Sequence, residues 1–453
     1  MEMETILLYC ILVMTWVESS WNFYLVLRQR NVLKTTSVIP HDLNGIISEE
    51  TFSKARLYNL DSISFGILHS LFDNVVGTLI IILYVMPLLW SYSTSLANKV
   101  GFKDSEIIVS IIFMLIMNTF NGLMSLPFAI YSVFVIEEKH GFNKQTPAFF
   151  IKDTLKGYFL MQFFIVLLTS PIIYIVNAGG DYFFIYLWLF AVFFTLFFMT
   201  IYPDVIAPLF DKYTPLEDGD LRTRIEELAA SIQFPLKKIY VVEGSKRSAH
   251  SNAYFYGFYK NKRIVLFDTL LIDYVSSDAK NKETASESSE PETKPLVPAE
   301  KKGCTNDEVL AVLAHELGHW KGNHVLKQLI LSQVNLFFLF MAFSFLFKYD
   351  VIYRAFGFYD SQPVIIGLLI ILQFIFTPYH FILSFLLTLL TRKYEFEADN
   401  FAMRLGKAEF LRKALIKLNK DNLGFPVYDW LYSTFNHSHP PLLERLKALD
   451  KVE

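Results

Sequence analysis

The sequence predicts an all-α polytopic membrane protein with seven transmembrane helices and a large polar region that contains a small β element. Of its 453 residues, 53% are hydrophobic and 19% are charged, whereas an average soluble domain is about one quarter charged. Seven apolar stretches are long enough to cross a bilayer, which takes about 20 residues of helix. The polar region follows the fifth stretch and includes two runs rich in β-branched and aromatic residues.

The seven predicted spans are 5–26, 67–94, 106–135, 157–178, 182–206, 327–347 and 362–390. We expect the first to be retained, because Glu2 and Glu4 precede it and the basic residues follow it, the reverse of a secretory signal. Polar residues within or near the spans favour a polar interior, since a charge at the bilayer centre costs about 2.5–3.5 kcal/mol. Hydrogen bonding between helices is the alternative for two or three of them. They are Glu18, Asn22, His69, Asp73, Asn74, Asn118, Asn121, Gln162, Asn335, Gln373 and His380.

Basic residues gather in the connections that follow the first and third spans. Lysine and arginine near span ends favour the cytosolic side, so these connections and the C-terminus are predicted to be cytosolic and the N-terminus to face the other side. A net charge of −3 gives no reason to expect a nucleic-acid partner. Cys10 lies in an apolar run and Cys304 in a polar segment, so a disulfide framework is not expected.

The chain is expected to divide into four parts. These are 1–207 with five spans, the cytosolic region 208–326, 327–390 with two spans, and the cytosolic C-terminal region 391–453. Within the polar region, residues 238–242 and 263–267 are predicted strands. Residues 276–303 are rich in Ser, Glu, Lys, Pro and Ala and are predicted to be a disordered insertion.

The motif His315-Glu316-Leu317-Gly318-His319 lies in a run that is typical of a helix, because acidic residues precede an apolar pattern. The two histidines are one turn apart, so both project from one face and could bind a single zinc ion. Glu316 would lie beside the metal, where it could take a proton from a metal-bound water and deliver it to a leaving amine. The motif therefore predicts the centre of a zinc metallopeptidase.

A catalytic zinc usually has three protein ligands and a water. The helix-like run after the last span offers the third, because Glu395 and Asp399 share a face while Glu397 points roughly opposite. We assign Glu395 to the zinc ion, and we assign Asp399 to the free ring N–H of a zinc-bound histidine. Two crossings separate this run from the histidine motif, so both are expected on the same side of the membrane.

Two further histidines are open to interpretation. His324 is one turn and one residue beyond His319, off the predicted zinc face, and is expected to be a surface or interfacial residue. His439 precedes two prolines and a helix-like run, so it could cap that helix. Alternatively, it could stabilise the oxyanion of a tetrahedral intermediate. Spacing alone leaves both roles open.

Taken together, these motifs resemble the type I CAAX prenyl proteases, the family of a-factor-converting and prelamin A-processing zinc metalloproteases. The resemblance extends over the whole chain. It rests on HELGH at 315–319, EFEAD at 395–399, RSAHSNAYFYG at 247–257 and SHPPLLERL at 438–446. It implies seven helices that form a barrel around a water-filled chamber, closed by a cytosolic zincin-like metalloprotease cap.

The resemblance also implies an activity and a set of site residues. Such enzymes cleave after the prenylated cysteine of a C-terminal CaaX sequence, release the last three residues, and in some members make a second upstream cut. One Zn²⁺ per chain, prenylated CaaX substrates and membrane lipid are the expected partners, in the endoplasmic reticulum and inner nuclear membranes. By position, His315, His319 and Glu395 correspond to the zinc ligands and Glu316 to the base. Asn252, His439 and Arg445 correspond to residues that hold the substrate backbone or steady the transition state.

Three alternatives fit part of this pattern. An intramembrane site-2-type protease carries its HExxH inside an apolar span, whereas Trp-Lys-Gly-Asn-His after His319 suits an interface. A membrane quality-control metallopeptidase of related fold is the second alternative. The sequences at 247–257 and 438–446 argue against it, because they resemble the prenyl protease family. A seven-span receptor or transporter with an incidental HExxH would bind no zinc.

Overall fold

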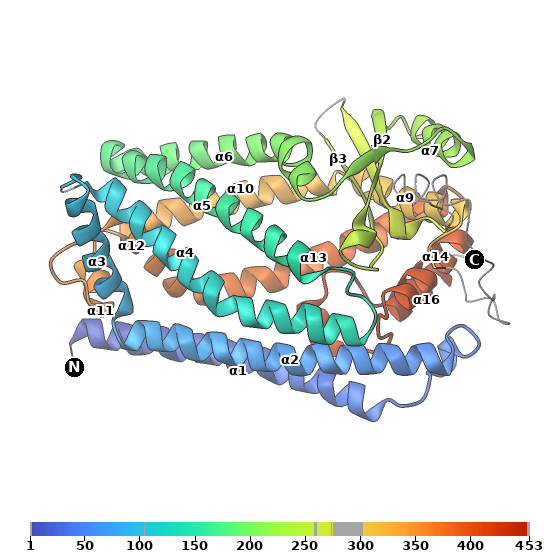
Figure 1. Ribbon diagram of the computed structural model, residues 1–453, viewed down its shortest axis with the longest axis horizontal. Coiled ribbons are helices and arrows are strands. Elements are labelled where there is room, and N and C mark those ends of the chain that lie inside the picture. Colours follow the sequence, from blue (N-terminus) through green and yellow to red (C-terminus); the bar gives the residue numbers. More distant parts are fainter. Residues whose placement is uncertain (1, 104, 258–260, 273, 275–301, 451–453) are drawn as a thin grey trace.

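The computed structural model describes residues 2–103, 105–257, 261–272, 274 and 302–450. Long helices run side by side along the molecule and end at a compact cap that contains the sheet (Figure 1). The N-terminus lies at the end opposite this cap and the C-terminus lies within the cap (Figure 1). Most of the predicted insertion, residues 276–301, lies outside the described residues.

The described chain contains six helical segments long and apolar enough to cross a membrane, and a bent pair of helices supplies a seventh span. The six are Met3–Thr35 (α1), Glu49–Ile82 (α2), Glu106–Glu137 (which contains α4, Glu106–Tyr131), Pro147–Ala178 (α5), Gly180–Leu209 (which contains α6, Phe183–Ile201) and His324–Leu346 (α10). The pair consists of Val364–Ile375, which begins with α12 (Val364–Leu369), and α13 (Thr377–Arg404), bent by 60°. The predicted membrane architecture is therefore confirmed.

The predicted bounds of the second span, 67–94, are wrong. Helix α2 begins at Glu49, after Ser48 caps it by accepting a hydrogen bond from Thr51 N, and it ends at Ile82. Tyr84 has a left-handed backbone with φ of 49°, which turns the chain into a separate helix, α3 (Val85–Lys99). An apolar window misses this turn because the residues on both sides of it are equally apolar.

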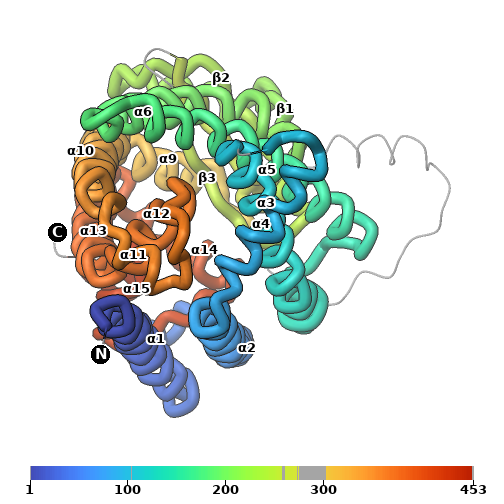
Figure 2. The backbone as a smooth tube through the Cα atoms, turned by 90° about the vertical axis from the view of Figure 1, so that its left-hand side faces the viewer, coloured from blue at the N-terminus to red at the C-terminus, as the bar shows by residue number. Residues whose placement is uncertain are grey.

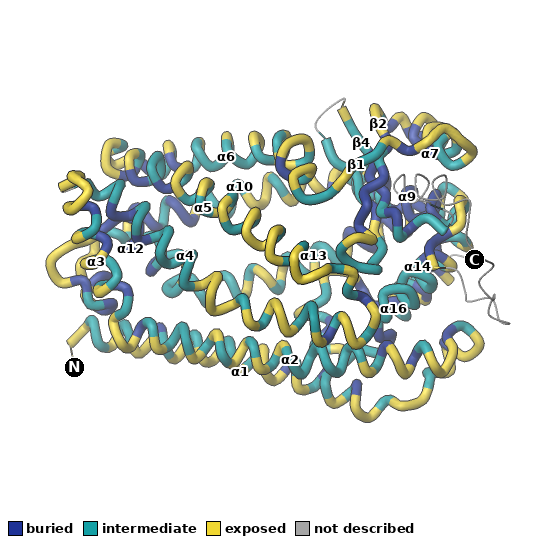
Figure 3. The backbone as a smooth tube through the Cα atoms, viewed as in Figure 1, coloured by how far each residue is buried: buried dark blue, intermediate teal, exposed yellow. Residues whose placement is uncertain are grey.

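The long helices form a ring when the molecule is viewed end-on (Figure 2). In the most apolar window of each of the six unbroken spans, only 6–17% of residues are buried, so both faces of these helices are largely accessible. Buried residues gather instead in the cap and at the opposite end, near α3 and α12 (Figure 3). At that opposite end Phe113, Phe343 and Tyr353 are fully buried in one cluster that also includes residues of α12. This arrangement agrees with the expected barrel.

Three of the polar residues in the spans take the role that the alternative predicts. Asn74, Gln162 and Asn335 form hydrogen bonds to side chains of neighbouring helices, as the alternative predicts for two or three of them. Four of the eleven, including Asn22 and Asn121, are exposed, and the other seven are half-buried. None of the set is fully buried.

The cap is built on a four-stranded sheet of order β1-β2-β4-β3. Its strands are Tyr213–Pro215 (β1), Leu236–Val242 (β2), Ala253–Tyr256 (β3) and Lys262–Phe267 (β4). β2 and β4 are parallel and include both predicted strands, whereas β1 and β3 pair antiparallel at the two edges. The edge strands were not predicted because three or four residues are too few for a recognisable alternation.

Among the described residues, five helices complete the cap. They are α7 (Asp220–Ser231), α9 (Asn306–Lys321), α14 (Ala408–Asp421), α15 (Trp430–Asn436) and α16 (Leu442–Asp450). Ile225, Val241, Ile264 and Val309 are fully buried where α7 and α9 pack on the sheet. Helix α10 leads away from α9, and the bent span returns so that the last turns of α13 pack against α9. This hairpin of crossings brings two distant segments of the chain together.

Candidate active site

Helix α9, which carries the histidine motif, has a well-defined start and a buried face. Thr305 accepts a hydrogen bond from Glu308 N and the Glu308 side chain accepts one from Thr305 N, which forms a capping box. The helix then buries almost every side chain from Val309 to Gly318, including His315. The predicted helix is confirmed, and its burial holds the two histidines in fixed positions.

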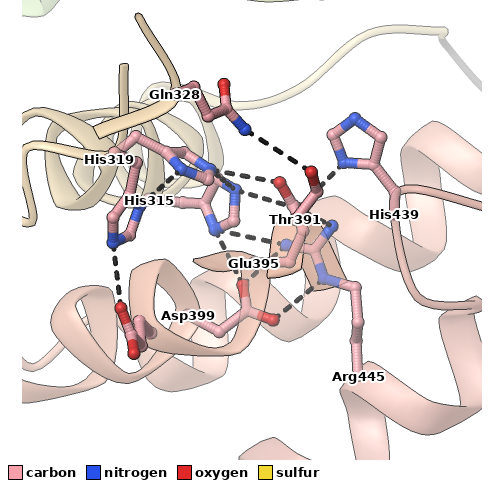
Figure 4. Close-up of polar contacts among 10 residues, drawn as sticks. His315, His319, Gln328, Thr391, Glu395, Asp399, His439 and Arg445 are labelled. Carbon is pink, nitrogen blue, oxygen red and sulfur yellow. Dashed lines mark hydrogen bonds and ion pairs between the residues drawn. The ribbon is translucent and has the colours of Figure 1, made fainter. Parts of the chain in front are cut away.

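The structure brings His315, His319 and Glu395 together, with one ligand atom of each within 4.8 Å of the others (Figure 4). His315 Nε2 lies 3.2 Å from His319 Nε2. Glu395 Oε1 lies 3.2 Å from His319 Nε2, and Glu395 Oε2 lies 3.5 Å from His315 Nε2. A tetrahedral zinc ion with bonds of about 2.0–2.2 Å keeps its ligand atoms about 3.3–3.6 Å apart. The three side chains therefore have the spacing that zinc requires.

The charges at this cluster also suit a cation. Glu395 is 2% exposed, and its two oxygens face ring nitrogens of His315 and His319. A buried carboxylate is costly unless it is paired or coordinates a metal, so its position among these nitrogens suits a bound cation. The ring nitrogens of His315 and His319 that face each other cannot both carry protons. Two imidazole nitrogens and a carboxylate that converge on one point fit a divalent ion, which displaces any proton from its ligand atoms when it binds.

The opposite nitrogen of His315 is held by an ionic network. Asp399 Oδ1 lies 2.8 Å from His315 Nδ1, and Arg445 donates to both oxygens of Asp399, over 2.6 and 2.9 Å. Burial by itself lowers the pKa of His315, but hydrogen bonds with Asp399 and Glu395 raise it to about 9. Asp399 therefore lies where it can accept a hydrogen bond from His315 Nδ1–H, while His315 Nε2 faces the cluster.

The other predicted residues differ in how close they come to the cluster. Glu316 lies on the same helix, burial raises its pKa, and its carboxylate makes no hydrogen bond within the described chain. His439 Nδ1 lies 2.9 Å from Glu395 Oε2, so its ring faces the cluster instead of capping α16. Arg445 binds Asp399 and lies 3.7 Å from Glu395 Oε2. Asn252 directly precedes β3, its Oδ1 accepts a hydrogen bond from Ala253 N, and no hydrogen bond within the described chain joins it to the three clustered side chains.

The prediction for His324 is wrong. Its side chain is 3% exposed, its Nδ1 lies 3.0 Å from His319 Nδ1, and its Nε2 lies 3.0 Å from Glu397 Oε2. The spacing argument assumed a continuous helix, whereas Asn323 has φ of 52° and separates α9 from α10. That turn brings His324 back over His319. The Gly322-Asn323 pair, a frequent helix terminator, is the signal that could have revealed this.

Gly318 allows α9 and α13 to approach closely. A Cβ atom at this position would lie 2.9 Å from Ala398 Cα and 3.0 Å from Ala398 O, which are backbone atoms that cannot rotate away. Replacing Gly318 with alanine should push the two helices apart and weaken zinc binding about tenfold or more. The measurement is zinc affinity by competition with a chromophoric chelator. Gly157→Ala is the control, because a Cβ there meets nothing within 4 Å. Unchanged affinity in Gly318→Ala would contradict this account.

The chain is similar over its full length to proteins of one kind. A family model described as CAAX prenyl protease N-terminal, five membrane helices, matches residues 28–212, and the model of peptidase family M48 matches residues 215–453. The CAAX prenyl protease 1 homologs of Mus musculus and Homo sapiens are each 52% identical, over 98% of this chain and 95% of theirs. The crystal structure of S. mikatae Ste24p is 34% identical and superposes with a TM-score of 0.84 over 98% of both chains.

Proposed function

Because this chain belongs to peptidase family M48 and its CAAX prenyl protease branch, we propose that it is a zinc metalloendopeptidase that removes the last three residues of prenylated CaaX proteins. The observation that carries the proposal is the convergence of His315, His319 and Glu395 on one point beside Glu316. Family membership also sets aside the receptor or transporter alternative, and the curated relatives favour CaaX processing over quality control.

In this proposal each residue of the site has a distinct part. His315, His319 and Glu395 would hold the zinc ion, which when bound would polarise the scissile carbonyl and lower the pKa of a water. Glu316 would accept a proton from the attacking water and pass it to the leaving amine. His439, which faces the cluster with an exposed ring, donates a hydrogen bond to the oxyanion. Arg445 acts on His315 through Asp399.

The sheet offers a place for the peptide. β3 is an edge strand, since β4 is its neighbour on one side only, and it packs against α9. An extended substrate can add to such an edge through backbone hydrogen bonds, which would place its scissile bond beside the helix that carries Glu316. Asn252, at the start of β3, is then positioned to bind the substrate backbone.

A prenyl group needs an apolar surface. A cavity of about 570 Å³ between α2 and α4 is lined by Phe65, Leu68, Phe128 and Tyr131, together with Asp61 and Lys139. An apolar wall of this kind suits an isoprenoid group. We place the enzyme in the endoplasmic reticulum and inner nuclear membranes, with the cap on the cytosolic side. The basic residues after the first and third spans support that orientation.

The decisive test is cleavage of a synthetic farnesylated CaaX peptide by the purified protein. We expect release of the C-terminal tripeptide, loss of activity after treatment with a zinc chelator, and recovery when one equivalent of zinc is restored. The same peptide without its farnesyl group is the control and should be cleaved far more slowly. Activity that remains after chelation, or that is equal for the farnesylated and the unfarnesylated peptide, would contradict the proposal.

A further inference from the structure

His319 is backed by a second set of side chains that the sequence pattern did not indicate. Its Nδ1 lies 3.0 Å from His324 Nδ1, and His324 Nε2 lies 3.0 Å from Glu397 Oε2. Glu397 is partly exposed, with 43% of its side chain accessible, and Lys393 Nζ lies 3.7 Å from its other oxygen. The path therefore runs from the zinc site, through a buried imidazole, to a carboxylate at the protein surface.

The order of donors and acceptors along this path follows from elementary chemistry. A carboxylate only accepts hydrogen bonds, so His324 Nε2 carries the proton that binds Glu397. In a neutral imidazole the other nitrogen is then bare, and His324 Nδ1 accepts a hydrogen bond from His319 Nδ1–H. That leaves His319 Nε2 without a proton, in the tautomer a metal ion needs. Glu397 thus selects, through His324, the tautomer of His319.

The two histidines of the motif are consequently oriented by different means. His315 donates directly to Asp399, whereas His319 reaches its carboxylate through an intervening ring. The His324 ring is held in place by Tyr394, which stacks on it with centroids 4.1 Å apart and planes 8° apart.

Gly322 supplies an independent indication that the position of this ring matters. A Cβ atom at residue 322 would lie 2.3 Å from His324 Nε2 and 2.8 Å from two ring carbons. The backbone of Gly322, with φ of −74° and ψ of −4°, is one that any residue adopts. A larger residue here would have to displace the imidazole, so glycine leaves the space that the ring occupies, while its backbone conformation does not call for glycine.

We propose that His324 and Glu397 are positioning residues that fix the tautomer and ring orientation of His319 at the metal site. This inference rests on the proposed function, because it concerns the same zinc centre. Partners of this kind, when removed from metal-ligating histidines, typically cost about 10–100-fold in metal affinity or activity.

Two substitutions of His324 separate this role from simple packing. His324→Phe keeps a ring to stack on Tyr394 and loses the acceptor, whereas His324→Asn loses the ring and keeps an acceptor close to the place of Nδ1. If His324 only fills space, the phenylalanine variant should bind zinc more tightly than the asparagine variant. If His324 accepts a hydrogen bond from His319, the asparagine variant should bind zinc more tightly.

The experiment measures zinc affinity of the full-length protein in detergent, by competition with a chromophoric chelator, together with the d–d absorption of the Co²⁺-substituted protein. We expect His324→Phe and Glu397→Leu, which each remove an acceptor, to bind zinc about 10–100-fold more weakly. His324→Asn and Glu397→Gln, which each keep an acceptor, should stay within about threefold of wild type. Gly322→Ala should weaken zinc binding to a similar extent as His324→Phe, because it displaces the His324 ring while the side chains of His324 and Glu397 stay chemically intact. Gly157→Ala serves again as the glycine control.

The outcomes distinguish the inference from the function on which it rests. Wild-type protein that binds no zinc would overturn the proposed function itself. If the wild type binds zinc and His324→Phe binds it equally well, or better than His324→Asn, the proposed positioning of His319 by His324 and Glu397 is wrong. The proposed metallopeptidase function is then unaffected. An unchanged Co²⁺ spectrum in both His324→Phe and Gly322→Ala would likewise overturn the proposed positioning.

Discussion

Replacing Glu316 with glutamine is expected to lower kcat/KM for a farnesylated CaaX peptide by about 10²–10⁴-fold while zinc remains bound. Glutamine keeps the size of the side chain but has no basic oxygen to accept a proton from water. The three predicted ligands are unchanged, and Glu316 makes no hydrogen bond within the described chain, so the fold should tolerate the change.

Two measurements on the same preparation test this expectation. Turnover is followed by tripeptide release, and zinc content is determined by metal analysis, with one ion per chain expected in both proteins. Glu227→Gln makes the same chemical change at an exposed position of α7 and should leave both values unchanged. Near-normal turnover in Glu316→Gln would show that another group serves as the base.

Replacing Glu395 with alanine should have the largest effect on the metal. Glu395 is the only carboxylate in the described three-residue cluster, and without it the two imidazoles lack the negative charge and third ligand of a catalytic zinc site. We expect affinity to fall by more than the roughly 10–100-fold typical of losing a supporting partner. Activity should fall with it at ordinary zinc concentrations.

Glu397→Gln is the matched comparison, because it lies two residues away on the same helix and its side chain is partly exposed. It should bind zinc almost as the wild type does, since the amide oxygen can still accept from His324. A Glu397→Gln protein that loses zinc while Glu395→Ala retains it would reverse the assignment of the ligand.

His324 and the carboxylates of α13 show when residue spacing predicts the direction of a side chain. Helical periodicity separated Glu395 and Asp399 from Glu397 correctly, because α13 is unbroken from Thr377 to Arg404. The same rule failed for His324, because the left-handed residue Asn323 interrupts the helix before it. Helical periodicity predicts side-chain direction only while the backbone stays helical. A single residue with positive φ ends the helix, and spacing across it no longer predicts direction.

The sequence by itself determined the features that depend on local pattern. Apolar length set the number of membrane spans, and the one-turn spacing of His315 and His319 put both rings on one face, because these properties follow from helix geometry alone. Only the tertiary structure decided which side chains contact His315 and His319. The packing of α9 on α13 at Gly318 brings Glu395 to the histidines, and the turn at Asn323 places His324 behind His319. Both depend on contacts between segments far apart in the chain or on a backbone reversal, which no local pattern encodes.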